Sequence, residues 1–345
     1  MRTAKRICLA LIATLILATS IHGFATQRSY ESFRGYVLEK RLGENLVKLL
    51  STHLVMRYVS LRLSKHVEGS TTASITMLLQ PMLIVMGSGW IYTNVSLTYV
   101  YATPSLKNVG RDNETKFVVR RGEPRMESVT IFAEGSEAMV RRSVALQRFA
   151  VDTTWRELFD DGRVARVEIH SLFRMLVTNR SVGYSMYVEY SSNEIVKRIE
   201  LVQSGVRIVV IVDLNNDAIS VSIGNERKFL LNDDARKFVE MLKNLPNHIA
   251  VKYLNSSVTR IGETTIPLYT FEIVIDVPFK GSNVSMILFK NSTTTFIDIA
   301  GIALFSYREH VHLAIMRIRA ENRSAEAKVS NYVIETKIRR VELQP

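Results

Sequence analysis

Cysteine is almost missing from this chain of 345 residues: the only one is Cys8, close to the N-terminus. Proline and glycine are also sparse, with 7 and 16 residues. Without a second cysteine, an intramolecular disulfide and a zinc site built from several cysteines are excluded. A folded protein of this composition therefore has to be stabilised by an ordinary hydrophobic core.

The N-terminus has the layout of a secretory signal peptide. Arg2, Lys5 and Arg6 precede an uncharged apolar stretch at residues 7–18, and small residues follow up to Ala25. A basic region, a short apolar region and a small-residue cleavage site in this order are typical of exported chains. The sequence therefore predicts an extracytoplasmic protein, secreted or held at the cell surface.

We expect a signal peptide over residues 1–25 and an extracytoplasmic, β-rich region over residues 26–345. Cleavage would remove Cys8 and leave a mature chain without a thiol, which excludes a cysteine nucleophile. The alternative is an uncleaved anchor, because residues 7–25 approach the roughly 20 residues that a membrane helix needs.

A second stretch, residues 70–106, contains no charged side chain. Pro81, Gly87 and Gly89 divide it into strand-length pieces, and alternating threonines and serines follow. We therefore expect strands here and no transmembrane span in the mature chain. The charged, glycine-containing stretch near 107–127 favours a polar connection, so the β-rich region is either one domain or two closely packed lobes.

The chain is basic, with a formal net charge of +12. Such a surface attracts acidic polysaccharide or other anionic envelope components, although solubility alone is the simpler explanation. No block of basic residues with interleaved aromatic residues is present, so we expect no nucleic-acid partner.

Asn-X-Ser/Thr triplets occur seven times, where about three are expected by chance. Behind a signal peptide this excess predicts N-glycosylation. The acceptor asparagines are Asn94, Asn113, Asn179, Asn255, Asn283, Asn291 and Asn322.

Two of these acceptors flank the apolar run at residues 286–289. Polar residues before 284 and at 290–293 indicate turns. We therefore expect Asn283 and Asn291 in or beside loops at opposite ends of one short strand.

Hydrophobic periodicity predicts an α+β fold that is mainly β, with antiparallel meander sheets that are curved or two-layered. Two prominent helices are expected, near residues 32–50 and 233–245. The second has capping residues before it, an apolar face that includes Phe238 and Leu242, and Pro246 as a stop. Strands are expected at 164–176, 182–190, 195–202, 206–212, 218–223, 266–277, 284–289, 294–305, 310–319 and 328–341.

Candidate metal ligands are few. His310 and His312 lie two apart on a predicted strand and share a face, which suits zinc or copper. No third ligand is identifiable, so we expect a solvent-facing pair. Asp213 begins a stretch similar to a calcium loop, but Ala218 stands where that loop requires glycine. We predict a hairpin turn there.

No catalytic motif is present. The chain lacks a phosphate-binding loop, a dinucleotide fingerprint, a His-Glu-X-X-His motif and a nucleophile elbow. We predict no cofactor and no catalytic residue. A hydrolase with a dispersed active site remains an alternative.

Some strands are apolar on both faces, for example residues 206–212 and 286–289. They predict a second covering layer of helices or sheet. The alternative is a curved sheet that carries lipid or another apolar ligand. The order of elements is similar to the general plan of periplasmic lipoprotein and lipid carriers, at the level of the fold alone. Our first expectation is an exported, N-glycosylated cell-surface or envelope-associated binding or structural protein.

Overall fold

The computed structural model describes the chain with several gaps. The described residues are 38–40, 42–44, 83–85, 87–97, 99–105, 114–122, 125–145, 149–161, 163–192, 195–203, 205–225, 227–230, 232–281, 284–320 and 323–344. The predicted signal peptide lies outside them.

Most of these residues form strands. Besides the helical residues 38–40 and 42–44, the helices are α3 (Asn232–Lys243) and the 3-10 helix η2 (Leu245–His248). The strands are β1 (Leu83–Val85), β2 (Gly89–Leu97), β3 (Tyr99–Ser105), β4 (Glu114–Gly122), β5 (Arg125–Glu134), β6 (Glu137–Ala145), β7 (Phe149–Asp160), β8 (Arg163–Met175), β9 (Arg180–Tyr190), β10 (Val196–Gln203), β11 (Val206–Asp213), β12 (Ala218–Ile223), β13 (Arg227–Leu230), β14 (Ile249–Ile261), β15 (Thr264–Lys280), β16 (Val284–Ile299), β17 (Ala303–Ala320) and β18 (Arg323–Gln344).

The predicted fold class is confirmed. In the part of the chain that the structure describes, the protein is mostly antiparallel β-sheet with little helix, and the sheet is open rather than closed into a barrel. Strands β8 to β12 lie within about two residues of their predicted bounds. Apolar and polar side chains alternate along these strands and polar turns separate them, and this pattern predicts strand bounds well.

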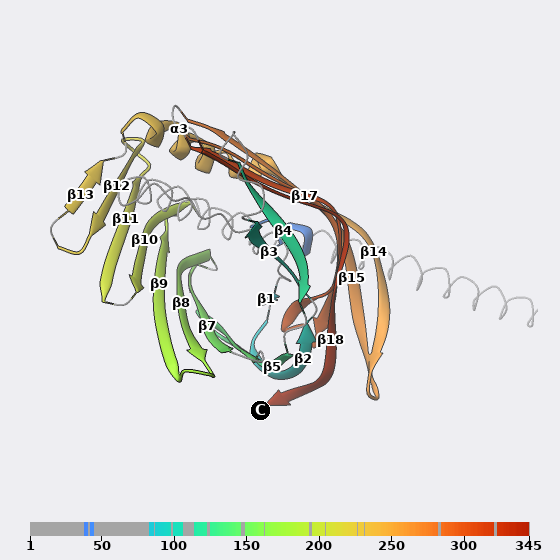
Figure 1. The fold of residues 1–345 in the computed structure, drawn as a ribbon. Helices are drawn as coiled ribbons and strands as arrows, with labels where there is room; N and C mark the ends of the chain where they lie inside the picture. Colours follow the sequence, from blue (N-terminus) through green and yellow to red (C-terminus); the bar gives the residue numbers. More distant parts are fainter. Residues whose placement is uncertain are drawn as a thin grey trace, which may run out of the picture.

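The strands form two walls that are joined through β18 (Figure 1). The long-strand wall consists of β14, β15, β16, β17 and the first part of β18, each paired with the next. The meander wall runs from β5 to β13 in chain order. After Glu335, β18 leaves β17 and pairs with β2, which itself pairs with β5. One strand therefore belongs to both walls.

Helix α3 confirms the predicted helix at 233–245, although it ends two residues earlier. Its apolar face includes Phe238 and Leu242, which are fully buried. Phe238 packs edge-on against Phe279 of β15, with ring centroids 5.3 Å apart. Pro246 cannot continue the α-helix, and the chain passes into η2. No helix in the described part of the chain is long and apolar enough to cross a membrane.

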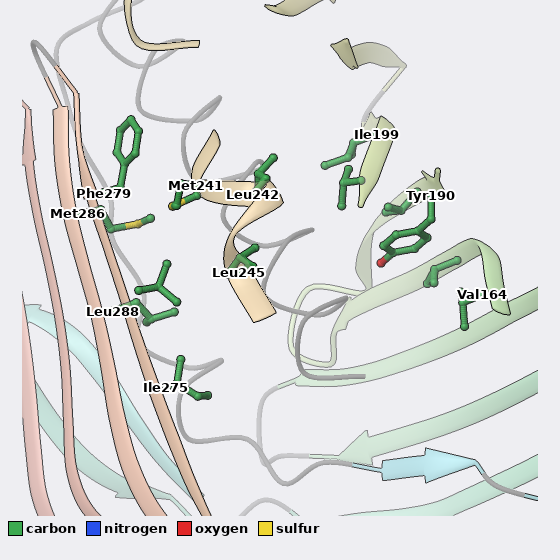
Figure 2. Close-up of a cluster of buried hydrophobic side chains, with 14 of the residues drawn as sticks. Val164, Tyr190, Ile199, Met241, Leu242, Leu245, Ile275, Phe279, Met286 and Leu288 are labelled. Atoms are coloured by element: carbon green, nitrogen blue, oxygen red, sulfur yellow. The ribbon is translucent and has the colours of Figure 1, made fainter. Parts of the chain in front are cut away.

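The core lies between the two walls. Figure 2 shows Met241 of α3 beside Phe279 and Met286 of the long-strand wall, with Tyr190 and Ile199 of the meander wall on the other side. All of these side chains belong to one buried cluster. Within the interval of the helix predicted near 32–50, the described residues 38–40 and 42–44 are helical, and their two leucines are buried in this cluster. Burial of each large side chain stabilises the fold by about 1.5–3 kcal/mol.

The predicted turn at residues 290–293 is wrong. Strand β16 is continuous from Val284 to Ile299, so the separate strands expected at 284–289 and 294–305 are replaced by β16 and the start of β17. The chain turns after Ile299, where Ala300 and Gly301 have positive φ angles of 53° and 72°. Polar side chains that resemble a turn are here paired with strands on both sides.

The interval near 107–127 was expected to be a polar connection. It contains β4 and the start of β5, and β4 pairs with β3 and, in parallel, with β18. Residues 106–113 and 123–124 lie outside the described residues.

The strands that are apolar on both faces have a cover on one face. In β16, Leu288 is 4% exposed and Ile287 is 38% exposed. In β11, Val210 and Val212 are buried and Ile211 is exposed. The expected second layer over the outer face is therefore wrong at Ile287 and Ile211. We call the covered side the inner face and the opposite side the outer face.

Candidate functional site

A groove lies on the outer face of the meander wall, across β7 to β10. It has a volume of about 430 Å³ and is lined by residues that include Asp152, Thr154, His170, Leu172, Gly183 and Ser185. Register explains the arrangement. Asp152 lies opposite Leu172, and Leu172 lies opposite Gly183. Ile169, next to His170, and Val188, three residues after Ser185, are buried on the opposite face, so His170 and Ser185 face outward.

Polar contacts fix the side chains of this groove. His170 Nδ1 lies 2.9 Å from Ser185 Oγ on the next strand. Ser143 donates to Asp152 Oδ1 at 2.7 Å, and Arg174 donates to Asp152 Oδ2 at 2.5 Å. Gly183 leaves the floor open, because an added Cβ would meet only the Ser171 carbonyl oxygen at 3.8 Å and Leu172 Cδ1 at 3.9 Å. The result is an open groove with hydroxyl, imidazole, carboxylate and guanidinium groups along its rim.

The groove contains the residue types of a serine hydrolase, but not its pattern of hydrogen bonds. A catalytic triad needs the histidine to contact both the serine and a carboxylate. His170 contacts Ser185, whereas both carboxylate oxygens of Asp152 are occupied by Ser143 and Arg174. The described contacts hold these polar side chains in place and do not connect His170 to a carboxylate.

The inner face of the long-strand wall carries a buried ion pair. Lys290 Nζ lies 2.5 Å from Glu309 Oε1, and their side chains are 9% and 3% exposed. Thr294 also donates to Glu309 Oε1, at 3.2 Å. Lys290 lies opposite Ile275, a member of the apolar core. Since both charges compensate each other, the pair is complete without a ligand.

A second inner-face cation is Arg142 of β6. It lies opposite Val129 on one side and Thr153 on the other, and Thr153 shares a hydrogen bond of 3.0 Å with Ser171. Burial lowers the pKa of the Arg142 guanidinium. Among the residues that the structure describes, no carboxylate forms an ion pair with it. Arg142 is half-buried and is therefore a cation that an anionic group would stabilise.

The predicted histidine pair lies on the outer face of β17. The rings of His310 and His312 are 4.3 Å apart and tilted, and His312 Nε2 lies 2.8 Å from Thr293 Oγ1. No group of three His, Cys, Asp or Glu side chains suited to a metal occurs in the described ranges.

The stretch that begins at Asp213 forms the predicted hairpin turn between β11 and β12. Asp213 Oδ1 accepts backbone N–H groups of Asn215 and Asn216, and Asn216 Nδ2 donates to Asp213 Oδ2. These hydrogen bonds, the side-chain one first, lower the pKa of Asp213. The carboxylate is engaged in an Asx turn.

The acceptor asparagines lie in different environments. Asn179 is exposed in the β8–β9 turn, and Asn255 is exposed on β14. Asn291 lies in the middle of β16 between two strands, and its Oδ1 is buried with no hydrogen-bond partner. Asn94 is in β2. Asn113, Asn283 and Asn322 lie outside the described residues.

Sequence patterns did not identify the groove, because its residues come from four strands and share no local motif. The alternation in β8 shows only that His170 and Leu172 share a face. No protein-family model, curated protein or solved structure matches the chain. Its function has to be argued from its own geometry.

Proposed function

We infer that the chain is an exported, N-glycosylated, envelope-associated binding protein and that the groove on β7 to β10 contacts an acidic polysaccharide of the envelope. The observation that carries this proposal is the open outer groove with Asp152, His170 and Ser185 held in place by hydrogen bonds. The signal-peptide layout and the seven acceptor triplets support export and glycosylation.

Saccharide chains suit this groove for two physical reasons. Hydroxyl, imidazole and carboxylate groups together donate to and accept from sugar hydroxyls, and the groove is open to solvent. The net charge of +12 adds a long-range attraction to a polyanion. Because Arg174 and Asp152 form an ion pair, the groove itself does not repel an acidic polymer.

The test is to fill the groove without disturbing its walls. Gly183→Val adds a side chain at a position where an added Cβ makes only van der Waals contacts. We expect the affinity for a uronic-acid polymer, measured by calorimetry, to fall at least about tenfold. Thr264→Val, at an exposed position of β15, is the matched control and should bind like the parent.

A neutral dextran tested in parallel separates hydrogen bonding from charge. Binding of the acidic polymer should weaken as salt is raised, because exposed charges are screened. Equal affinity of Gly183→Val and the parent for the acidic polymer would show that the groove does not bind it.

A carrier of an apolar molecule with an anionic head group is a second candidate, favoured by Arg142. A carboxylate or phosphate would compensate the guanidinium. Native mass spectrometry of deglycosylated protein should then show extra lipid mass that Arg142→Met loses. Repeated preparations of the parent without such mass would rule this candidate out.

A further inference from the structure

Large apolar side chains remain exposed at several places on the sheet, and they are not distributed evenly. Ten are exposed among the described residues. Windows of four residues on either side of the seven acceptor asparagines cover about a fifth of the chain, so about two of the ten would fall there by chance. Six do, namely Met175, Leu176, Val177, Leu254, Val258 and Ile287.

The first cluster surrounds Asn179. The turn between β8 and β9 spans residues 176–179, and Val177 at its tip is 74% exposed. Asn179 is exposed and has a positive φ of 49°, so it projects from the turn rather than from a paired strand. A sugar attached to its Nδ2 would lie beside Leu176 and Val177.

The second cluster surrounds Asn255 on β14. This strand pairs with β15 on one side, and no register pair joins its other side to a strand that the structure describes. Figure 1 shows β14 at the border of the long-strand wall. Residues 254–258 are all exposed, with Val258 at 67%. A long strand with a free edge and apolar side chains is a template for pairing with another chain.

The register adds a local reason for placing a modification at Asn255. Tyr253 lies opposite Phe271 and Asn255 lies opposite Thr270, so Leu254 is an extra residue that forms a bulge. A bulge already disturbs pairing along the edge. A bulky hydrophilic group directly after it would block the approach of a second strand over the whole exposed stretch.

We propose that N-linked sugars on Asn179 and Asn255 cover the apolar side chains that the fold leaves exposed and keep the protein from associating with itself through them. This inference rests on the export and glycosylation in the proposed function. It does not depend on what the groove binds.

The sugar donor for this modification is an oligosaccharide linked to a lipid through phosphate. In the transfer from a lipid-linked phosphate oligosaccharide, the amide nitrogen of asparagine forms a bond to the anomeric carbon. The bond between that carbon and the phosphate oxygen breaks. The lipid phosphate leaves with the electron pair, and the amide loses one proton to a base of the transferase.

Asn291 provides the internal contrast. It lies between β15 and β17, is half-buried and has a buried Oδ1, so its side-chain amide is less accessible than those of Asn179 and Asn255. Glycopeptide mapping of protein from a glycosylating host should therefore find sugar at Asn179 and Asn255 and none at Asn291.

The experiment removes each acceptor triplet by its third residue. Ser181→Ala and Ser257→Ala abolish the triplets, whereas Ser181→Thr and Ser257→Thr keep them. Ser256→Ala is a further control, since it removes a neighbouring hydroxyl and keeps the triplet. We expect the two alanine variants at 181 and 257 combined to associate at protein concentrations on the order of 0.1 mM, measured by light scattering, while the parent and all controls stay monomeric.

A second set of variants separates exposed apolar surface from a damaged fold. Val177→Lys and Val258→Lys, introduced into the sugar-free protein, should restore the monomer, and the urea midpoint should stay unchanged. Monomeric sugar-free protein, or a parent with sugar at neither Asn179 nor Asn255, would overturn the inference. A parent with no sugar at any acceptor would in addition overturn the glycosylation in the proposed function, whereas groove binding is measured separately through Gly183→Val.

Discussion

Ion pairs on the inner and outer faces of the same sheet differ in their exposure to solvent. On the inner face, Lys290 and Glu309 are buried together between apolar neighbours. On the outer face, ion pairs such as Arg207 with Glu200 lie at the solvent boundary, with the Arg207 side chain 53% exposed. Each pair joins a basic side chain to a glutamate, but only the inner pair is shielded from water.

Inner-face side chains stabilise the fold, whereas outer-face side chains are accessible to other molecules. Inner side chains are closed in by α3 and the opposite wall, so each change there is costly. Outer side chains contribute little individually, because water already solvates them. The groove and the exposed acceptors Asn179 and Asn255 lie on accessible surface, where sequence can change at small cost in stability.

Breaking the inner ion pair should have the largest effect. Lys290→Met leaves the Glu309 carboxylate buried without its cation, and we expect the free energy of unfolding to fall by about 3–5 kcal/mol. Urea unfolding at neutral pH measures the loss. Arg207→Met, the outer counterpart, should cost less than about 1 kcal/mol.

Replacing both inner partners provides the control for this prediction. Lys290→Met with Glu309→Leu removes the unpaired charge, so stability should return to within about 2 kcal/mol of the parent. A single variant Lys290→Met with unchanged stability would mean that Glu309 is solvated after all.

Two consecutive residues of β16 differ in burial because their side chains lie on opposite faces of the sheet. Leu288 is buried and Ile287 is exposed on the opposite face. Leu288→Ala should lower the free energy of unfolding by about 2–5 kcal/mol, because it leaves a cavity in the core. Ile287→Ala should cost less than about 1 kcal/mol, because the side chain is already in contact with water. Similar losses for the two variants in urea unfolding would contradict the assignment of faces.

How far sequence predicts this fold is visible in the same region. Strands β8 to β12 were predicted because apolar and polar residues alternate between clear turns, and α3 because capping residues and Pro246 mark its ends. Residues 290–293 indicate a turn instead of a strand because lysine, asparagine, serine and threonine are typical of turns. In the sheet, Lys290 is stabilised by Glu309, a residue 19 positions away that only the register brings close.

The candidate site was not predictable for a related reason. Asp152, His170 and Ser185 stand on three strands, and their meeting depends on the register of two hairpins. A one-residue shift would turn every one of them to the other face. The acceptor triplets, in contrast, are local patterns. Sequence finds them, but only structure separates exposed Asn179 and Asn255 from Asn291.

The smallest predicted effect concerns the outer pair and its dependence on pH. Arg207 donates two hydrogen bonds of 2.8 Å to Glu200, and these, together with Arg198, hold the pKa of Glu200 below its ordinary value of 4.5. A carboxylate with a lowered folded-state pKa contributes stability above its unfolded pKa and loses it as pH falls through the folded pKa. Glu200→Gln should therefore cost less than about 1 kcal/mol at pH 7, and the difference from the parent should shrink below the ordinary pKa of glutamate.

Urea unfolding of the parent and Glu200→Gln at neutral and acid pH checks this. Because Arg207 is half exposed, added salt should also reduce the difference at pH 7. A difference that is the same at both pH values and insensitive to salt would show that Glu200 contributes through packing rather than charge. The outer face would then resemble the inner face more closely than its exposure indicates.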